Sequence, residues 1–142
     1  MMFFIYTLIN NPAALLPVGH LGVTHLDQSS PELDNLLRGR PGGNNQLIYW
    51  AEVSLLRWLF QSRQYPSVCL RVLSNNWLAI RLHARIGFKT VGTVPLMRWE
   101  AAGEVHLQPY VDGMTSGELV KASLLKMELT AKEFLKEHNA ER

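Results

Sequence analysis

The sequence has few of the features that would restrict its class at once. It contains a single cysteine, Cys69, which excludes an internal disulfide and fits a reducing, cytoplasmic compartment. Asp, Glu, Lys and Arg make up 18% of the residues, against about 25% in a typical globular domain. The formal net charge of +2 gives no reason to expect nucleic acid or an anionic membrane as a partner.

The sequence also lacks a long apolar run. Residues 1–9 are apolar, but about 20 apolar residues are needed to cross a bilayer. No basic residue precedes Phe3, as a signal peptide would require, so we expect a buried strand there. A chain of 142 residues with 47% hydrophobic content is long enough to form one domain with a sizeable core.

The first part of the sequence predicts three strands. Residues 3–9 and 17–26 are rich in side chains that favour strands, and we expect them to pair as an antiparallel hairpin. The Asn-Asn-Pro run at 10–12 is expected to end the first strand, because these residues favour turns. Residues 32–38 are expected to form the third strand, although the propensity argument is weak there.

A helix is expected over 46–61, after the glycine-rich segment 39–45. Its apolar stripe consists of Leu47, Ala51, Leu55 and Trp58, widened by Ile48, Leu56 and Leu59. An apolar face this wide predicts packing against a sheet. A further strand is expected over 68–73.

A second helix is expected within residues 74–88, with Asn75 or Asn76 as its N-cap and Gly87 just past its C-terminus. Its inward face is formed by residues at i, i+3, i+4 and i+7, namely Ala79, Leu82, His83 and Ile86. Arg81 and Arg85 point toward water. A histidine on the inward face is unusual.

The remaining sequence predicts two strands, 89–100 and 104–111, joined by a turn at 101–103. After a loop at 112–117, we expect a strand that ends at Leu129 and then a short polar helix. The alternative is a helix over 124–135, which also carries helical spacing. Strands followed by helices are typical of an α/β arrangement, in which helices cover a sheet.

The segment between the third strand and the first helix is a candidate anion site. Glycines leave backbone amides free beside a helix N-terminus, and Arg38 and Arg40 add full positive charges. A glycine-rich surface turn is the alternative. A dinucleotide fold is disfavoured, because the next strand ends in 73–76 without the carboxylate that such a fold uses.

Two motifs together resemble the GNAT superfamily of N-acetyltransferases. Residues 40–45, Arg-Pro-Gly-Gly-Asn-Asn, are similar to the phosphate-loop pattern Gln/Arg-x-x-Gly-x-Gly/Ala, with asparagine in the last place. Residues 76–88 follow the pattern Asn-x-x-Ala-x-x-Leu-Tyr-x-x-x-Gly-Phe, with His83 in place of the tyrosine. The likeness extends over about residues 15–95. It implies an α/β (α+β) fold with a mixed, mostly antiparallel central sheet, a βα acyl-CoA-binding core and flanking helices.

The resemblance implies acetyl-CoA as co-substrate, with its pyrophosphate on the amides of 40–45 and its pantetheine arm alongside 32–38. A backbone amide of that strand would polarise the thioester carbonyl. The cofactor-binding residues implied in this way are Leu36, Leu37, Arg38, Arg40, Gly42, Gly43, Asn44, Asn45, Asn76 and His83.

Two residues are expected to handle protons. His83 occupies the place of the family's proton donor, and a histidine can protonate the leaving thiolate near neutral pH; the alternative is a buried, hydrogen-bonded histidine without a catalytic role. Asp34 is the candidate general base, with Glu32 and Asp27 as further carboxylates. Asp34 and Glu32 alternate onto one face of their strand, and a solvated strand edge is the alternative reading of that face.

Other reactive side chains are expected to be structural. His20 and His25 would face opposite sides of one strand and would not easily share a metal, so no metal site is expected. Cys69 alternates with Val68 and Leu70 in an apolar strand and is expected in the core rather than as a nucleophile.

The function implied is transfer of an acetyl group from acetyl-CoA to a primary amine of a small molecule or amino-sugar. The alternatives are a CoA-binding or interaction module without turnover, and a structural domain whose glycine loop binds nothing. Residues 1–142 are expected to form one domain. Members of the GNAT superfamily usually have a strand and two helices before the hairpin, which wall the acceptor pocket, and we expect this chain to lack them. A second subunit, in a homodimer, or the segment 96–142 would then supply that wall.

Overall fold

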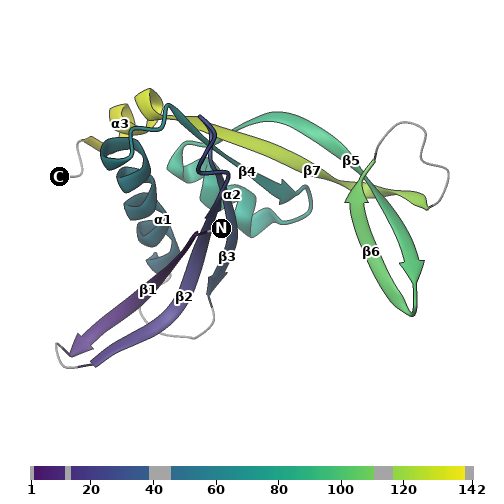
Figure 1. Ribbon diagram of the computed structural model, residues 1–142, viewed down its shortest axis with the longest axis horizontal. Helices are drawn as coiled ribbons and strands as arrows, with labels where there is room; N and C mark the ends of the chain where they lie inside the picture. The colour runs from purple at the N-terminus through teal and green to yellow at the C-terminus, as the bar shows by residue number, and fades with distance from the viewer. Residues whose placement is uncertain (1, 12–13, 39–45, 111–116, 140–142) are drawn as a thin grey trace. The chain divides into compact units, whose positions relative to one another are not determined.

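The computed structural model describes residues 2–11, 14–38, 46–110 and 117–139 of the chain (Figure 1). The chain divides into two compact units. The first contains Met1–Leu70 and Leu129–Arg142, and the second contains Arg71–Glu128. No helix in the described ranges is both long and apolar enough to cross a membrane.

The first unit begins with the expected antiparallel hairpin, formed by β1 (Met2–Asn11) and β2 (Ala14–Thr24). β1 ends within the predicted Asn-Asn-Pro run, but at Asn11, two residues later than expected, because Asn11 still pairs with Ala14 in the ladder. β2 ends at Thr24 rather than Leu26, since the next residue, His25, has a positive φ of 57°.

β3 covers Glu32–Arg38, as predicted, and pairs with β2 in antiparallel register. On its other side it pairs with β4 (Ser67–Leu73) in parallel register, through Glu32 with Cys69 and Leu33 with Leu70. The buried apolar side chains that these strands contribute to the first unit are Val18, Leu21, Val23, Leu33, Val68 and Leu70. The core of the first unit therefore lies on this sheet.

The first helix, α1 (Leu47–Arg57), continues into a π-helical turn, η1 (Trp58–Ser62). The π turn closes where the amide of Arg63 donates to the carbonyl of Trp58 at 3.0 Å. The expected apolar stripe is only partly right, since of its four residues Leu55 alone is buried. The buried face is rotated and consists of Tyr49, Glu52, Val53, Leu55, Leu56, Leu59 and Phe60. This face includes Glu52, a carboxylate that is fully buried.

The C-terminal helix, α3 (Ala131–His138), completes the first unit. Thr130 caps it, because its hydroxyl accepts a bond from the amide of Glu133 at 3.2 Å. Phe134 is fully buried, and its ring lies 5.2 Å from Phe60 and 4.5 Å from His138, measured between centroids. The prediction of a strand followed by a short helix is confirmed, and the alternative helix over 124–135 is wrong.

The second unit contains the end of β4, the helix α2 (Trp77–Ile86), and the strands β5 (Lys89–Ala101), β6 (Glu104–Pro109) and β7 (Glu118–Thr130). The last two residues of β7, Leu129 and Thr130, belong to the first unit. β5 pairs in antiparallel register with β6 and with β7 (Figure 1). Ala102 and Gly103 form the predicted turn, with φ of 52° and 80°. The return strand ends at Pro109, two residues earlier than expected.

Gly117, at the start of β7, has to be a glycine. Its φ is +103°, and a Cβ there would lie 2.9 Å from the carbonyl oxygen of Arg98. Of the strand pairs with a described register, β3–β4 is parallel and the others are antiparallel. The predicted class, a mixed and mostly antiparallel sheet with helices, is confirmed.

Candidate functional site

The helix α2 has the caps that its sequence predicts. Of the two candidate asparagines it is Asn76 that forms the N-cap, where its Oδ1 accepts a bond from the amide of Ala79 at 3.2 Å. At the other end Gly87 has φ of 127°, and the amides of Gly87 and Phe88 donate to the carbonyl of His83 at 3.2 and 3.0 Å. A side chain at Gly87 would strain this turn. Residues 76–88 therefore form one structural element with defined ends.

His83 lies on the inward face of α2, as predicted. Only 7% of its surface is exposed, whereas Arg81 and Arg85 are exposed. Its ring makes an edge-on contact with Phe88, with centroids 5.7 Å apart and the planes at 71°. Because Phe88 is itself buried, the imidazole is held by packing as well as by its helix.

The start of α2 is anchored to β7. The amide of Ser74 donates to the carbonyl of Ser123 at 2.8 Å, and the hydroxyl of Ser74 accepts from the amide of Ser123 at 3.0 Å. The amide of Asn76 donates to the carbonyl of Leu73 at 2.9 Å. These bonds fix the position of the N-cap within the second unit.

The cap makes a direct prediction about stability. Asn76→Ala is expected to lower the free energy of unfolding by about 1 kcal/mol, because an amide in the first turn of α2 loses its acceptor. Asn76→Asp keeps an acceptor oxygen and should stay close to the wild type. Urea unfolding followed by circular dichroism measures both variants, and equal midpoints for alanine and aspartate would contradict the capping role.

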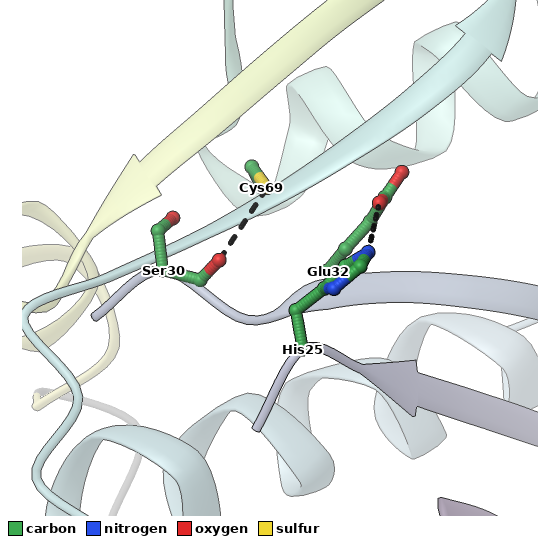
Figure 2. Close-up of polar contacts among 4 residues, drawn as sticks. All are labelled: His25, Ser30, Glu32 and Cys69. Atoms are coloured by element: carbon green, nitrogen blue, oxygen red, sulfur yellow. Dashed lines mark hydrogen bonds and ion pairs between the residues drawn. The ribbon is translucent and has the colours of Figure 1, made fainter. Parts of the chain in front are cut away.

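The carboxylates of β3 lie in different surroundings. Asp34 is exposed, whereas Glu32 is buried. Figure 2 shows the carboxylate of Glu32 beside the imidazole of His25, with Oε2 and Nε2 3.7 Å apart. Asp27 is exposed in the turn after β2. Asp34 therefore has the solvent access that a base acting on a bound amine needs.

The position of His25 corrects the expectation that His20 and His25 lie on one strand. His25 lies beyond the end of β2 with a positive φ, so it does not share a strand with His20. The turn reverses the chain and brings His25 to Glu32, the first residue of β3 (Figure 2). In the described ranges, no three His, Cys, Asp or Glu side chains gather so as to hold a metal ion.

Cys69 is half-buried on β4 rather than fully enclosed. Its thiol lies 3.8 Å from the carbonyl oxygen of Ser30, to which it donates a weak hydrogen bond (Figure 2). The neighbouring backbone is paired, since the amide of Cys69 donates to the carbonyl of Pro31 at 3.0 Å. The thiol thus packs at the junction of β3 and β4.

The predicted cofactor residues fall into three groups. Leu36, Leu37 and Arg38 belong to β3 in the first unit, with Asp34. Asn76 and His83 belong to α2 in the second unit. The third group lies outside the described residues and comprises Arg40, Gly42, Gly43, Asn44 and Asn45.

One buried acid escaped the sequence analysis. Glu52, on α1, is fully buried. The signal that could have found it is spacing, because Tyr49, Glu52, Leu56 and Leu59 repeat at helical intervals, and the other three are apolar.

Comparison with protein-family models found no match, and comparison with curated protein sequences found none either. Solved structures do resemble the chain. A GNAT-family acetyltransferase from Bacillus anthracis superimposes with a TM-score of 0.66 at 13% identity, over 92% of this chain and 67% of that chain. Mutant forms of the spermidine/spermine N-acetyltransferase from Vibrio cholerae superimpose with a TM-score of 0.66 at 13% identity, over 95% of this chain and 69% of that chain.

A ribosomal-protein-alanine N-acetyltransferase from Brucella melitensis gives a TM-score of 0.58 at 16% identity, over 90% of this chain and 67% of that chain. In each case almost the whole of this chain is matched by about two thirds of a longer acetyltransferase. The chain has the fold of the GNAT family of acetyltransferases.

Proposed function

We propose that this protein transfers an acetyl group from acetyl-CoA to a primary amine of a small molecule or amino-sugar, in the cytoplasm. One feature of β3 carries the proposal. β3 pairs with β4 in parallel register through Glu32–Cys69 and Leu33–Leu70, and it continues as a strand to Arg38. An extended ligand arm can add to a strand edge through backbone hydrogen bonds.

The pantetheine arm of acetyl-CoA has the shape that such an edge accepts. It would lie along β3 near Leu36 and Leu37. The pyrophosphate would then bind the amides of residues 40–45, and Arg38 and Arg40 would offset its charge. Asn76 and His83 of α2 are assigned to the same co-substrate.

The reaction proposed is a direct displacement. The amine nitrogen forms a bond to the thioester carbon, a backbone amide of β3 stabilises the oxyanion, and the carbon–sulfur bond breaks as the carbonyl reforms. Asp34, which is exposed on β3, takes the proton that the amine loses. His83 donates a proton to the departing CoA thiolate. No covalent enzyme intermediate and no metal is required.

Binding is tested by calorimetry with acetyl-CoA. The wild-type protein is expected to bind it, and Gly43→Glu is expected not to, because a carboxylate would enter the loop assigned to the pyrophosphate. Gly92→Glu is the matched control, since a Cβ at Gly92 has no atom within 4 Å. A wild-type protein that shows no heat at millimolar acetyl-CoA would rule out the proposed function.

Turnover is tested by the release of free thiol from acetyl-CoA over a panel of primary amines. Release that depends on the amine supports the transferase. The burial of His83, which stands where the resembled family has tyrosine, favours a binding module as the second candidate. Binding of acetyl-CoA without release across the panel would identify that module.

A further inference from the structure

Among the described residues, β6 is the last strand of its sheet. In the strand order its one neighbour is β5, and Figure 1 shows the two strands as a hairpin. Natural edge strands are usually protected by a bulge, a lysine or a proline. The ladder between β5 and β6 has no register shift, β6 contains no lysine, and its proline, Pro109, is the terminal residue.

The pairing with β5 determines which backbone groups of β6 face outward. The amide of Tyr110 donates to the carbonyl of Pro95 at 2.8 Å, and this pair continues the register in which Trp99 faces His106. Because bonding direction alternates along an antiparallel strand, Glu104, His106 and Gln108 direct their N–H and C=O groups to β5. Val105 and Leu107 direct theirs away from it.

The side chains of β6 alternate as well. Val105 and Leu107 lie on one face of the strand and are 55% and 51% exposed. Glu104, His106 and Gln108 lie on the other face, where the His106 ring stacks on Trp99 with centroids 4.4 Å apart. The Nε2 of His106 is 3.5 Å from the carboxylate of Glu104. Polar and apolar residues in 104–108 therefore alternate symmetrically about His106, so the pattern reads the same in both directions along the strand.

We propose that β6 pairs with β6 of a second copy of this chain, in antiparallel register about a two-fold axis at His106. In this register Val105 of each copy faces Leu107 of the other, and both residues direct their backbone groups outward. Each of the two Val105–Leu107 pairs exchanges two N–H···O bonds, so the two pairs give four. The two β5–β6 hairpins become one continuous sheet.

The neighbouring two-fold registers are less favourable. Centred on Leu107, the pairing would place Val105 opposite Pro109 of the second copy, which has no N–H to donate. Centred on Val105, it would place Leu107 opposite Gly103, whose φ of 80° belongs to the turn. The register centred on His106 avoids both residues.

The side chains fit the same register. Val105 and Leu107 of the two copies form one apolar cluster of four on one face. On the other face Glu104 lies opposite the neutral Gln108, and the carboxylate of each Glu104 lies diagonally near His106 of the second copy. No like charges lie opposite each other across the two β6 strands. On the neighbouring β5, Arg98 is already paired with Glu100 of its own chain. A strand of unrelated sequence would lack this symmetry, which is why a second copy is the partner.

Sedimentation velocity tests the association over about 1–200 µM protein, a range that covers weak pairing of a short strand. The wild-type protein is expected to form a dimer as its concentration rises. Leu107→Lys is expected to shift the protein to monomer, because it places two lysines in the apolar cluster. The matched control is Leu119→Lys on β7, where the side chain is 64% exposed but away from the β6 edge. A monomeric wild type, or a dimer that survives Leu107→Lys, would overturn the proposal.

Cysteine cross-linking tests the register in a Cys69→Ser background, which removes the native thiol. His106→Cys is expected to give a disulfide-linked dimer under mild oxidation. Its Cα would lie about 4.5 Å from its twin, as in a non-hydrogen-bonded pair, and this is within the disulfide range. Glu104→Cys is the control, because its twin would lie about 13 Å away along the strand. Equal cross-linking of the two variants would exclude this register, and circular dichroism verifies that each variant is folded.

Discussion

His83→Ala is expected to lower kcat for acetyl transfer by about 10²- to 10⁴-fold, the usual contribution of a positioned general acid. The effect on the affinity for acetyl-CoA is expected to be small, because the imidazole acts on the thiolate only as the carbon–sulfur bond breaks. The contact with Phe88 holds His83 on the inward face of α2 within the second unit. Steady-state kinetics and calorimetry on the same samples measure the two quantities.

Two aromatic variants separate proton donation from packing. His83→Tyr introduces the residue that the resembled family has at this place, and His83→Phe has the same ring without the hydroxyl. Both fill the buried position more fully than alanine does, so they share any cost of overpacking. The tyrosine variant is expected to be at least tenfold faster than the phenylalanine variant. If His83→Ala and the wild type turn over equally, His83 has no part in the reaction.

Phe134→Ala is expected to reduce the free energy of unfolding by about 3–5 kcal/mol, as is typical when a buried phenylalanine is truncated. Phe134 is fully buried between Phe60 and His138, so the lost ring leaves a cavity in the first unit. A loss of this size is a large part of the stability of a domain, which is about 5–15 kcal/mol. Guanidinium unfolding monitored by circular dichroism measures it.

Leu135→Ala is the matched control for that variant. Leu135 is the next residue of α3 and is only half-buried, and the substitution likewise introduces alanine into the helix. Its loss of stability is expected to be well below that of Phe134→Ala. Similar midpoints for the two variants would show that the docking of α3 on Phe60 contributes little.

The elements that the sequence predicted best are those with a local physical cause. α2 has the Asn76 cap and the Gly87 turn that its residues predict. A short pattern of a capping residue and a glycine defines the ends of this helix without help from distant residues. β3 also begins and ends where expected, although the propensity argument for it was weak. The inward position of His83 follows from the same helical spacing.

The expectations that failed concern burial and the position of a strand end. Counting only apolar side chains misplaced the face of α1, because Glu52 is buried with its neighbours Val53 and Leu56. His25 was assigned to a strand, but it lies in the turn that brings it beside Glu32. The burial of Glu52 follows the helical spacing of its apolar neighbours, whereas propensity alone does not predict the contact of His25 with Glu32.

The candidate site was predictable as a set of residue types more than as a geometry. The motif at 76–88 correctly predicted a capped helix carrying His83. Asp34 and Glu32, predicted on one face of their strand, differ in burial, since Asp34 is exposed and Glu32 is buried beside an imidazole. Alternation along a strand gives the face of a residue, but the depth of burial at each position depends on what covers the strand.

The division of the chain also bears on its synthesis. The first unit is discontinuous in sequence, because Leu129–Arg142 returns to join Met1–Leu70. During translation the ring of Phe60 would therefore wait for Phe134, which is made only after the whole second unit has been synthesised. Domains that need late residues expose apolar surface while they are being made. Nascent chains stalled before α3 are the stage at which this protein would depend most on chaperones.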